Sequence, residues 1–289
     1  MIIFFQSGQL GNQIFQYLAM KKFDNDAKVI FFGADALVKV FALDIINIPL
    51  PKKEDNYSYK LFFRVTSYLL PSILLFLSDS IRLISSVEES RSSNGSKFLT
   101  KHGLIKKIIF FKKSYYQCED ISQTPAARNL KIHQHIIEEA KKKIDQFELD
   151  STELYFIHIR RGDFLHWPSS SSPAVVPLAW FIKQMKLIQT KQPRAKFLIF
   201  SNDKPYIEEF FSDYPACRLV SETEEIEFAM MSLCYGGGIL SPSTFAWWAA
   251  FLCQRDFINP SHIAPRYWIG HRSAKWYPPG IQTDWIQYD

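Results

Sequence analysis

Cysteine is scarce in this sequence: four copies occur in 289 residues, and they lie far apart. None of them forms a Cys-x-x-Cys pair, the spacing that zinc sites and redox disulfides commonly use. Their positions are Cys118, Cys217, Cys234 and Cys253. The pattern argues against a zinc site and against a disulfide scaffold, and it predicts buried free thiols in a reducing cytoplasm.

Signatures of several nucleotide-binding classes are also missing. There is no Gly-x-x-x-x-Gly-Lys-[Ser/Thr] loop, which argues against an ATPase of that class. No Gly-x-Gly-x-x-Gly follows a predicted strand, which argues against a nicotinamide dehydrogenase. No Asp-x-Asp follows a predicted strand of the second half, so a metal-dependent nucleotide-sugar site is not predicted. If a diphosphate leaves here, arginines and helix amides must stabilise its charge in place of a cation.

Charge and targeting signals are weak. The net charge of +5 does not by itself indicate nucleic acid, although a basic chain suits an anionic ligand or an acidic membrane surface. Met1–Phe5 runs directly into a strand-like segment, so a signal peptide is not predicted. The apolar stretch Leu61–Leu77 contains Arg64 and Pro71 and is marginally long for a span, which predicts a buried or surface-lying helix. We expect a cytoplasmic protein, with the inner face of the membrane as an alternative location.

The abundant residues are apolar and aromatic: 47% of the chain is hydrophobic, and 25 residues are Phe. Such a chain buries large cores, and its length predicts two domains, 1–148 and 149–289. The first domain is expected to begin with a strand at 2–5, then a glycine loop, then a helix with Asn12 as N-cap. An apolar helical pattern follows over 57–86, and Pro71 interrupts it. Further features are a strand at 29–32, a polar loop at 91–103, a strand at 108–111 and an amphipathic helix at 132–147.

The second half alternates strictly between strand and helix, which predicts parallel βαβ units and a doubly wound α/β sheet. The expected strands are 154–159, 197–200, 218–220, 239–240 and 257–258, and the expected helices are 177–190, 205–211, 224–234 and 243–253. Three of these strands end in polar loops, which a parallel sheet brings to one edge.

The first of these loops carries His158, Arg160, Arg161 and Asp163. Two adjacent guanidinium groups suit a diphosphate, because each donates two parallel charge-assisted hydrogen bonds. The alternative is that the arginines form ion pairs with Asp163 or with another carboxylate.

The second loop is Ser201–Asp203, and the third is Ser241–Thr244 at the start of a helix. Free amides at that helix start suit an anion, and the Asp203 carboxylate suits base or ribose donors. The alternatives are structural: Ser243 and Asp203 serve only as helix caps, and the tryptophans at 247 and 248 only as core.

The residues of these loops resemble motifs of the α-1,2-fucosyltransferases and related inverting fucosyltransferases. His158–Asp163 matches the hallmark His-x-Arg-Arg-Gly-Asp of that family. Other segments resemble family motifs in family order: Gly8–Tyr17, Phe200–Asp203, Met230–Cys234, Ser241–Leu252 and Ile263–Trp268. Departures are Pro242, Asn202 and the glycine run 236–238.

The resemblance implies a GT-B architecture, in which two Rossmann-like domains face each other across a cleft. Domain 1–148 would lie on the acceptor side and 149–289 would bind GDP-fucose, with the extreme C-terminus packing back on the first domain as one possibility. It implies inverting transfer of fucose to the 2-hydroxyl of a β-galactoside, without a cofactor or an essential metal. A bacterial enzyme that builds surface polysaccharide fits these features. Rival functions are another fucosyl linkage (O-fucosyl or α-1,6) and a non-catalytic sugar-nucleotide or glycan-binding protein.

The resemblance also implies residue roles. Arg160 would hold the diphosphate, His158 would lie at the nucleotide side, and Asn12 would lie across the cleft near the reacting sugar. The remaining donor-binding candidates are Arg161, Ser201, Asp203, Ser243, Thr244 and Phe245.

The general base is open. Asp163 is a candidate as the carboxylate on the key loop, and the rival is a dissociative path in which the leaving phosphate takes the proton. Arg161 and Asp163 would alternatively shape the loop without touching the donor. For the acceptor we name Gln9 and Trp167, whose indole suits the apolar face of a sugar; core packing is the alternative for Trp167.

Six lysines surround the expected strand at 108–111: Lys97, Lys101, Lys106, Lys107, Lys112 and Lys113. A solvated face is the interpretation that we favour, and the alternative is peripheral contact with an anionic membrane surface or acceptor. The lysines lack interleaved aromatics, so no nucleic-acid partner is predicted. The oligomeric state is not indicated.

Overall fold

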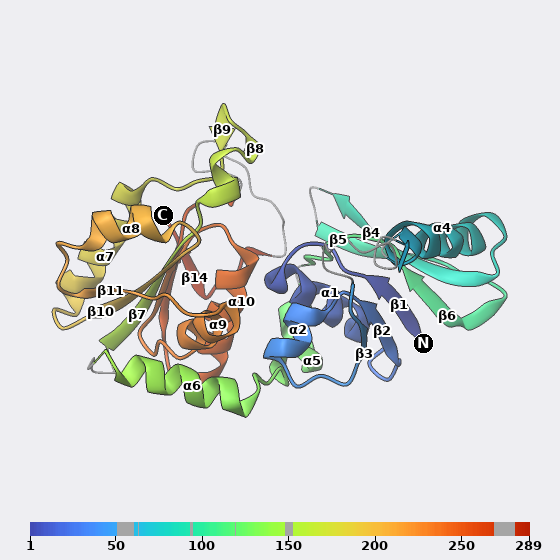
Figure 1. Cartoon of the computed structure of the whole chain (residues 1–289), viewed down its shortest axis with the longest axis horizontal. Helices are drawn as coiled ribbons and strands as arrows, with labels where there is room; N and C mark the ends of the chain where they lie inside the picture. The colour runs from blue at the N-terminus through green and yellow to red at the C-terminus, as the bar shows by residue number, and fades with distance from the viewer. Residues whose placement is uncertain (51–60, 63, 93–94, 119, 148–152, 269–280) are drawn as a thin grey trace. The chain divides into compact units, whose positions relative to one another are not determined.

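The computed structural model of the chain describes residues 1–50, 61–62, 64–92, 95–118, 120–147, 153–268 and 281–289. It divides into two compact units, Met1–Lys131 and Ile132–Asp289. Each unit is built on a six-stranded sheet with helices packed against it, which confirms the α/β class (Figure 1).

The first unit has the strand order β3-β2-β1-β6-β4-β5, in which only β5 runs antiparallel to its neighbour. Its strands are β1 Ile2–Phe5, β2 Val29–Phe32, β3 Ile46–Ile48, β4 Ile84–Ser92, β5 Gly95–Lys101 and β6 Ile105–Phe111. Its helices are α1 Leu10–Phe23, α2 Asp35–Val40, α4 Leu70–Leu75, a 3-10 turn Ile121–Gln123 and α5 Pro125–Arg128.

The helical segment 64–80 consists of α4 between two π-helical turns, Val65–Leu69 and Phe76–Ser80. The expected surface-lying helix at 61–77 is confirmed within the described residues. The expected break at Pro71 is wrong, because the helical segment continues on both sides of this proline. No helix among the described residues is long and apolar enough to cross a membrane.

The expected polar loop at 91–103 is also wrong over most of its length, as is the helical pattern beyond residue 80. Residues 84–92 and 95–101 form the antiparallel pair β4–β5, and 93–94 lie outside the described residues. The sequence looks polar there because β4 contains several Ser and Glu residues, although Ser85 and Ser86 are buried beside Ile84 and Val87. Phe98 on β5 packs against Phe111 and Tyr116, and this contact anchors the edge strand.

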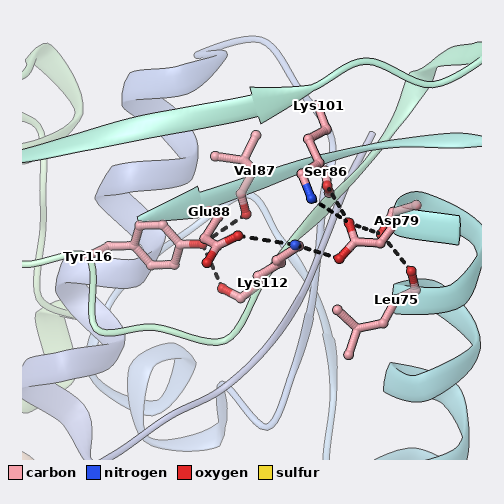
Figure 2. Close-up of polar contacts among 9 residues, drawn as sticks. Leu75, Asp79, Ser86, Val87, Glu88, Lys101, Lys112 and Tyr116 are labelled. Atoms are coloured by element: carbon pink, nitrogen blue, oxygen red, sulfur yellow. Dashed lines mark hydrogen bonds and ion pairs between the residues drawn. The ribbon is translucent and has the colours of Figure 1, made fainter. Parts of the chain in front are cut away.

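Lys112, which follows β6, bridges two carboxylates of the first unit (Figure 2). Its Nζ lies 2.7 Å from Oδ2 of Asp79 at the end of the helical segment and 3.1 Å from Oε2 of Glu88 on β4. Lys101 on β5 lies 3.7 Å from the other oxygen of Asp79. The network ties the helical segment to the sheet and neutralises both acids.

The second unit has an all-parallel sheet in the order β11-β10-β7-β12-β13-β14. Its strands are β7 Leu154–Ile159, β10 Lys196–Ser201, β11 Cys217–Leu219, β12 Gly237–Leu240, β13 Ser261–Ala264 and β14 Ile286–Tyr288. A separate hairpin joins β8 Pro168–Ser169 and β9 Ser172–Pro173. The helices are α6 Gln134–Asp145, α7 Leu178–Lys191, α8 Lys204–Phe211, α9 Glu224–Ser232 and α10 Thr244–Asp256. The predicted doubly wound parallel sheet is confirmed.

One expected strand is absent from the second unit, and two further observations concern the expected domain bounds. The expected strand at 257–258 is wrong: Ile258 is fully exposed, and the strand begins at Ser261. The units divide at residue 131 rather than 148, because α6 packs on α9. The last strand, β14, pairs with β13 and so belongs to the second sheet.

The core of the second unit surrounds β7, whose six residues are all buried. On α10 the tryptophans Trp247 and Trp248 are completely buried, which confirms the core alternative for both. All four cysteines are free and buried, as expected from their spacing.

Candidate active site

The ends of β10, β7 and β12 lie side by side in the second sheet. In the register Phe200 lies opposite His158 on one side of β7, and Leu240 lies opposite His158 on the other. The three polar loops predicted from the sequence therefore meet at one edge, where ligands of open parallel sheets bind.

Ser241 joins the first and third loops. Its Oγ lies 2.8 Å from Nδ1 of His158 and accepts a 3.1 Å hydrogen bond from the backbone N–H of Arg160. Its own N–H donates to the carbonyl of His158 at 3.0 Å. One hydroxyl thus fixes the imidazole and the start of the arginine loop together.

The His158 side chain is buried, and this burial, together with the nearby charge of Arg160, lowers its pKa to about 3. The imidazole is therefore neutral at neutral pH and acts as a hydrogen-bonding group rather than as a cation. Its ring lies 5.9 Å from that of Phe245, which itself packs on Phe228 at 5.2 Å.

Arg160 forms an ion pair with Asp163 three residues later. Its Nε and one terminal nitrogen donate to the two carboxylate oxygens at 2.9 and 3.1 Å. The guanidinium also lies over the ring of Phe164, 5.3 Å from its centroid. Both oxygens of Asp163 are engaged, so in this arrangement Asp163 positions the arginine.

Arg161 is tied to the second loop. Its backbone N–H donates to Oδ1 of Asn202 at 2.8 Å, and its Nε donates to Oδ2 of Asp203 at 2.9 Å. The guanidinium stacks on Tyr206, 3.6 Å from the ring centroid. The ion-pair alternative is thus what the structure shows for both arginines. Ser201 completes the junction by donating to the carbonyl of Ile159 at 2.8 Å.

Gly162 has a backbone conformation that any other residue would adopt only with strain. Its φ of +32° is rare for other residues, and a Cβ there would lie 2.5 Å from Nδ2 of Asn202. The glycine lets the first loop approach the second closely.

The start of α10 forms the third part of the site. Ser243 precedes the helix, but its side chain makes no capping hydrogen bond, so capping is not its role. Thr244 is the first helical residue, and Phe245 follows in the first turn, where helix amides have no partner within the helix. This terminus has the chemistry of an anion site.

Trp167 lies on the surface beside the arginine loop, with 42% of its side chain exposed. Its ring is 5.4 Å from that of Phe164, over which the guanidinium of Arg160 also lies. Core packing therefore does not account for Trp167. The hairpin β8–β9 continues directly from it.

The first unit holds the other two expected site residues at the start of α1. Asn12 lies in the first turn rather than at the N-cap, which is Gln9, an exposed residue. The Asn12 Oδ1 accepts a 2.8 Å hydrogen bond from Nε2 of Gln117. Gly8 has a φ of +82°, and a Cβ there would lie within 2.3 Å of the Asn12 amide.

Residues that the sequence reasoning missed support these loops. Gln16, which is buried, donates to the carbonyls of Ser7 and Ser114 at 2.7 and 3.0 Å and so holds the glycine loop in shape. Asn202 was noted only as a departure from a motif, although it holds the Arg161 backbone. A polar residue nearly two turns into a largely apolar helix was the available signal for Gln16. The described residues contain no cluster of three or more His, Cys, Asp or Glu that fits a metal ion.

The family pattern of glycosyl transferase family 11 matches residues 88–274, which include every loop of the site in the second unit. The chain belongs to glycosyl transferase family 11. This membership confirms the resemblance stated from the motifs, and it makes the chain a glycosyltransferase.

Two family relatives from Escherichia coli match nearly the whole chain. The O-antigen biosynthesis glycosyltransferase WbnK is 26% identical over 299 residues, covering 93% of this chain and 95% of the relative. An alpha-1,2-colitosyltransferase is 25% identical over 305 residues, covering 98% and 97% respectively.

Among solved structures, POFUT1 in complex with GDP matches with a TM-score of 0.50 and 12% identity, covering 88% of this chain and 95% of that one. At this identity the likeness concerns the fold alone. It agrees with the expected GT-B type.

Proposed function

We propose that the chain is an inverting α-1,2-fucosyltransferase that moves L-fucose from GDP-fucose to the 2-hydroxyl of a terminal β-galactoside. The observation that carries the proposal is the loop His158–Asp163, held at the end of β7 by Ser241 and Asn202. This loop lies within the segment that matches glycosyl transferase family 11, and its sequence resembles the hallmark motif of the α-1,2-fucosyltransferases. The relative named as an alpha-1,2-colitosyltransferase supports the proposed linkage.

The donor diphosphate would bind between the arginine loop and the start of α10. Arg160 would exchange the Asp163 carboxylate for a phosphate, since both anions accept the same pair of parallel hydrogen bonds. Ser243 and Thr244 would contribute hydroxyls and backbone amides from the helix start. These groups would stabilise the charge of the leaving GDP, and we propose that the reaction needs neither an essential metal nor a cofactor.

His158 would contact the nucleotide side as a neutral hydrogen-bonding group. Ser201 and Asp203 belong to the same edge, where Asp203 also holds Arg161 in place. Trp167 would offer its exposed indole to an acceptor sugar, and Asn12 and Gln9 are proposed to act from the first unit.

The base that takes the proton of the acceptor hydroxyl has two candidates. Asp163 becomes available when a phosphate replaces it on Arg160. The alternative is that the departing phosphate takes the proton itself. The first candidate couples donor binding to release of the base, because one guanidinium serves both anions in turn.

A specific observation favours a second candidate donor. One of the two relatives is named for colitose, which is the 3-deoxy form of L-fucose. A colitosyl donor would fill the same site without its 3-hydroxyl, so the two donors would differ at a single polar contact.

The experiment is release of GDP from GDP-fucose and from GDP-colitose with a panel of β-galactosides, followed by linkage analysis of the product. We expect GDP-fucose to be consumed and a fucose joined to the 2-position of galactose. A different linkage, or turnover with GDP-colitose alone, would replace the proposal with that activity. Binding of GDP-fucose without turnover on any galactoside would favour a sugar-nucleotide-binding protein.

A further inference from the structure

The helical segment 64–80 exposes an apolar surface that is unusual for a helix on a sheet. Its buried side packs Leu74, with Leu70 and Leu77, against apolar residues of the sheet. On the outward side, where polar residues are the rule, six exposed residues are apolar: Val65, Tyr68, Leu69, Ile73, Leu75 and Phe76. Tyr68 is 64% and Phe76 is 57% exposed. Figure 1 shows α4 within the first unit, packed on its sheet.

A second apolar segment adjoins the end of this helix. The backbone N–H of Leu104 donates to the carbonyl of Arg82 at 2.9 Å, and that of Ile105 donates to Leu83 at 2.8 Å. These bonds hold Leu104, which is 82% exposed, next to Arg82, whose neighbour in sequence, Ile81, is also exposed. The apolar surface therefore extends from the helix onto the turn before β6.

The edge strand β5 continues the same face. Phe98 points to the α1 side, where it packs near Phe23, so its neighbours Lys97 and Leu99 point to the side of the helical segment. The contact of Lys101 with Asp79 of that segment confirms this orientation. Both neighbours of Phe98 are exposed.

The charges around this surface are predominantly positive. The acids Asp79 and Glu88 are both engaged by Lys112 (Figure 2). Four exposed cations have no carboxylate partner among the described residues: Arg64, Arg82, Lys97 and Lys106. We call the exposed apolar residues of 65–81, Leu99, Leu104 and these four cations the apolar–basic face.

We propose that the apolar–basic face binds the surface of an anionic phospholipid bilayer. An in-plane helix that inserts apolar side chains below the headgroups, with cations at its border, is the arrangement of interfacial membrane helices. Each cation near such a surface adds to binding, and an apolar turn like that at Leu104 reaches past the headgroups. A protein partner would need acids matched one by one to cations that lie on separate segments, whereas a bilayer presents negative charge everywhere. The proposal is independent of the donor and the linkage.

The test is flotation of the full chain with vesicles of equal parts phosphatidylglycerol and phosphatidylcholine, compared with phosphatidylcholine alone. We expect the chain to float with the anionic vesicles only, and to be released at high salt. Replacing two cations, Lys97→Gln with Lys106→Gln, should weaken binding by about 30-fold, since each is worth about 1 kcal/mol near an anionic surface. The control with the same charge change is Lys141→Gln with Lys142→Gln on α6, which should bind as the wild type does.

A second variant tests the apolar part. Phe76→Ser with Leu104→Ser removes two exposed apolar side chains and should reduce flotation strongly, whereas the control Ile258→Ser, at another exposed apolar position, should not. All these side chains are exposed, so an unchanged melting temperature is expected and shows that the variants are folded. The proposal is overturned if the wild type does not float with anionic vesicles, or if the variants float as well as the controls. Loss of self-association in these variants, in a chain that does not bind vesicles, would assign the face to a second copy instead.

Discussion

Arg160 and Arg161 are adjacent in sequence but differ in their surroundings. Arg161 is held by Asn202, Asp203 and the ring of Tyr206, all on the neighbouring loop. Arg160 donates to Asp163, an exposed carboxylate of its own loop. Exchanging that carboxylate for a phosphate leaves the junction between the loops intact, so Arg160 is the better suited of the two to bind a ligand.

We expect Arg160→Ala to lower turnover by at least about 100-fold, the scale for removing a donor that stabilises developing charge. Arg160→Lys keeps the charge but loses the two parallel hydrogen bonds, and its turnover should fall between that of the wild type and that of Arg160→Ala. Steady-state rates at saturating GDP-fucose measure the effect. Near-normal turnover of Arg160→Ala would remove it from the mechanism.

Asp163→Asn separates the two roles of that carboxylate. If Asp163 only positions Arg160, turnover should fall by no more than about fivefold, because an ion pair this exposed contributes less than about 1 kcal/mol. A much larger loss in turnover, with the melting temperature unchanged, would identify Asp163 as the general base. Rates measured across pH distinguish the outcomes further, since loss of a base removes the acid limb of the profile.

The loops after β7 and β10 act as one element because short contacts join them. Arg161 reaches across to Asn202 and Asp203, while the hydroxyl of Ser201 reaches back to the end of β7. The geometry of either loop therefore depends on the other.

Gly162→Ala tests this dependence. A side chain at this positive φ costs about 1–3 kcal/mol, and its Cβ would displace the Asn202 amide that holds Arg161. We expect a lower melting temperature and a higher KM for the donor. Chemical unfolding of Gly162→Ala, Asn202→Ala and the double variant forms a cycle in which the losses should be less than additive. Full additivity would mean that the two side chains do not meet.

At the scale of the whole second unit, two buried imidazoles make stability depend on pH. Burial, and for His158 also the charge of Arg160, lowers each pKa from 6.5 to about 3. For His262 neither ring nitrogen has a hydrogen-bond partner among the described residues. Below pH 6.5 the unfolded chain binds protons that the folded chain does not, so stability falls from pH 6.5 towards about 3 and is unaffected by these groups above 6.5.

Each imidazole should contribute a slope of about 1.4 kcal/mol per pH unit in that window. His262→Phe is therefore expected to reduce the pH dependence of urea unfolding by that amount, whereas the control His102→Phe, at an exposed position, should leave it unchanged. An unaltered slope in His262→Phe would show that this imidazole titrates normally in the folded protein.

The second unit was largely predictable because its signals are local. Buried parallel strands read as continuous apolar runs, and polar residues at their ends locate the site edge. The partner of each arginine was not predictable, since Asp163 and Asp203 are both carboxylates within reach and only the folded loops decide between them. The first unit was less predictable, because the pair β4–β5 is polar along one side and because α4 continues past Pro71.

The pairing of both site arginines has a kinetic consequence. Arg160, Arg161, Asp163 and Asp203 together carry no net charge, so these loops exert little long-range attraction on a dianionic donor. The positive charge of Arg160 would attract the donor only at contact, when a phosphate displaces the Asp163 carboxylate. The rate of donor association should then vary little with ionic strength, and selectivity for the diphosphate would arise mainly in how slowly it dissociates.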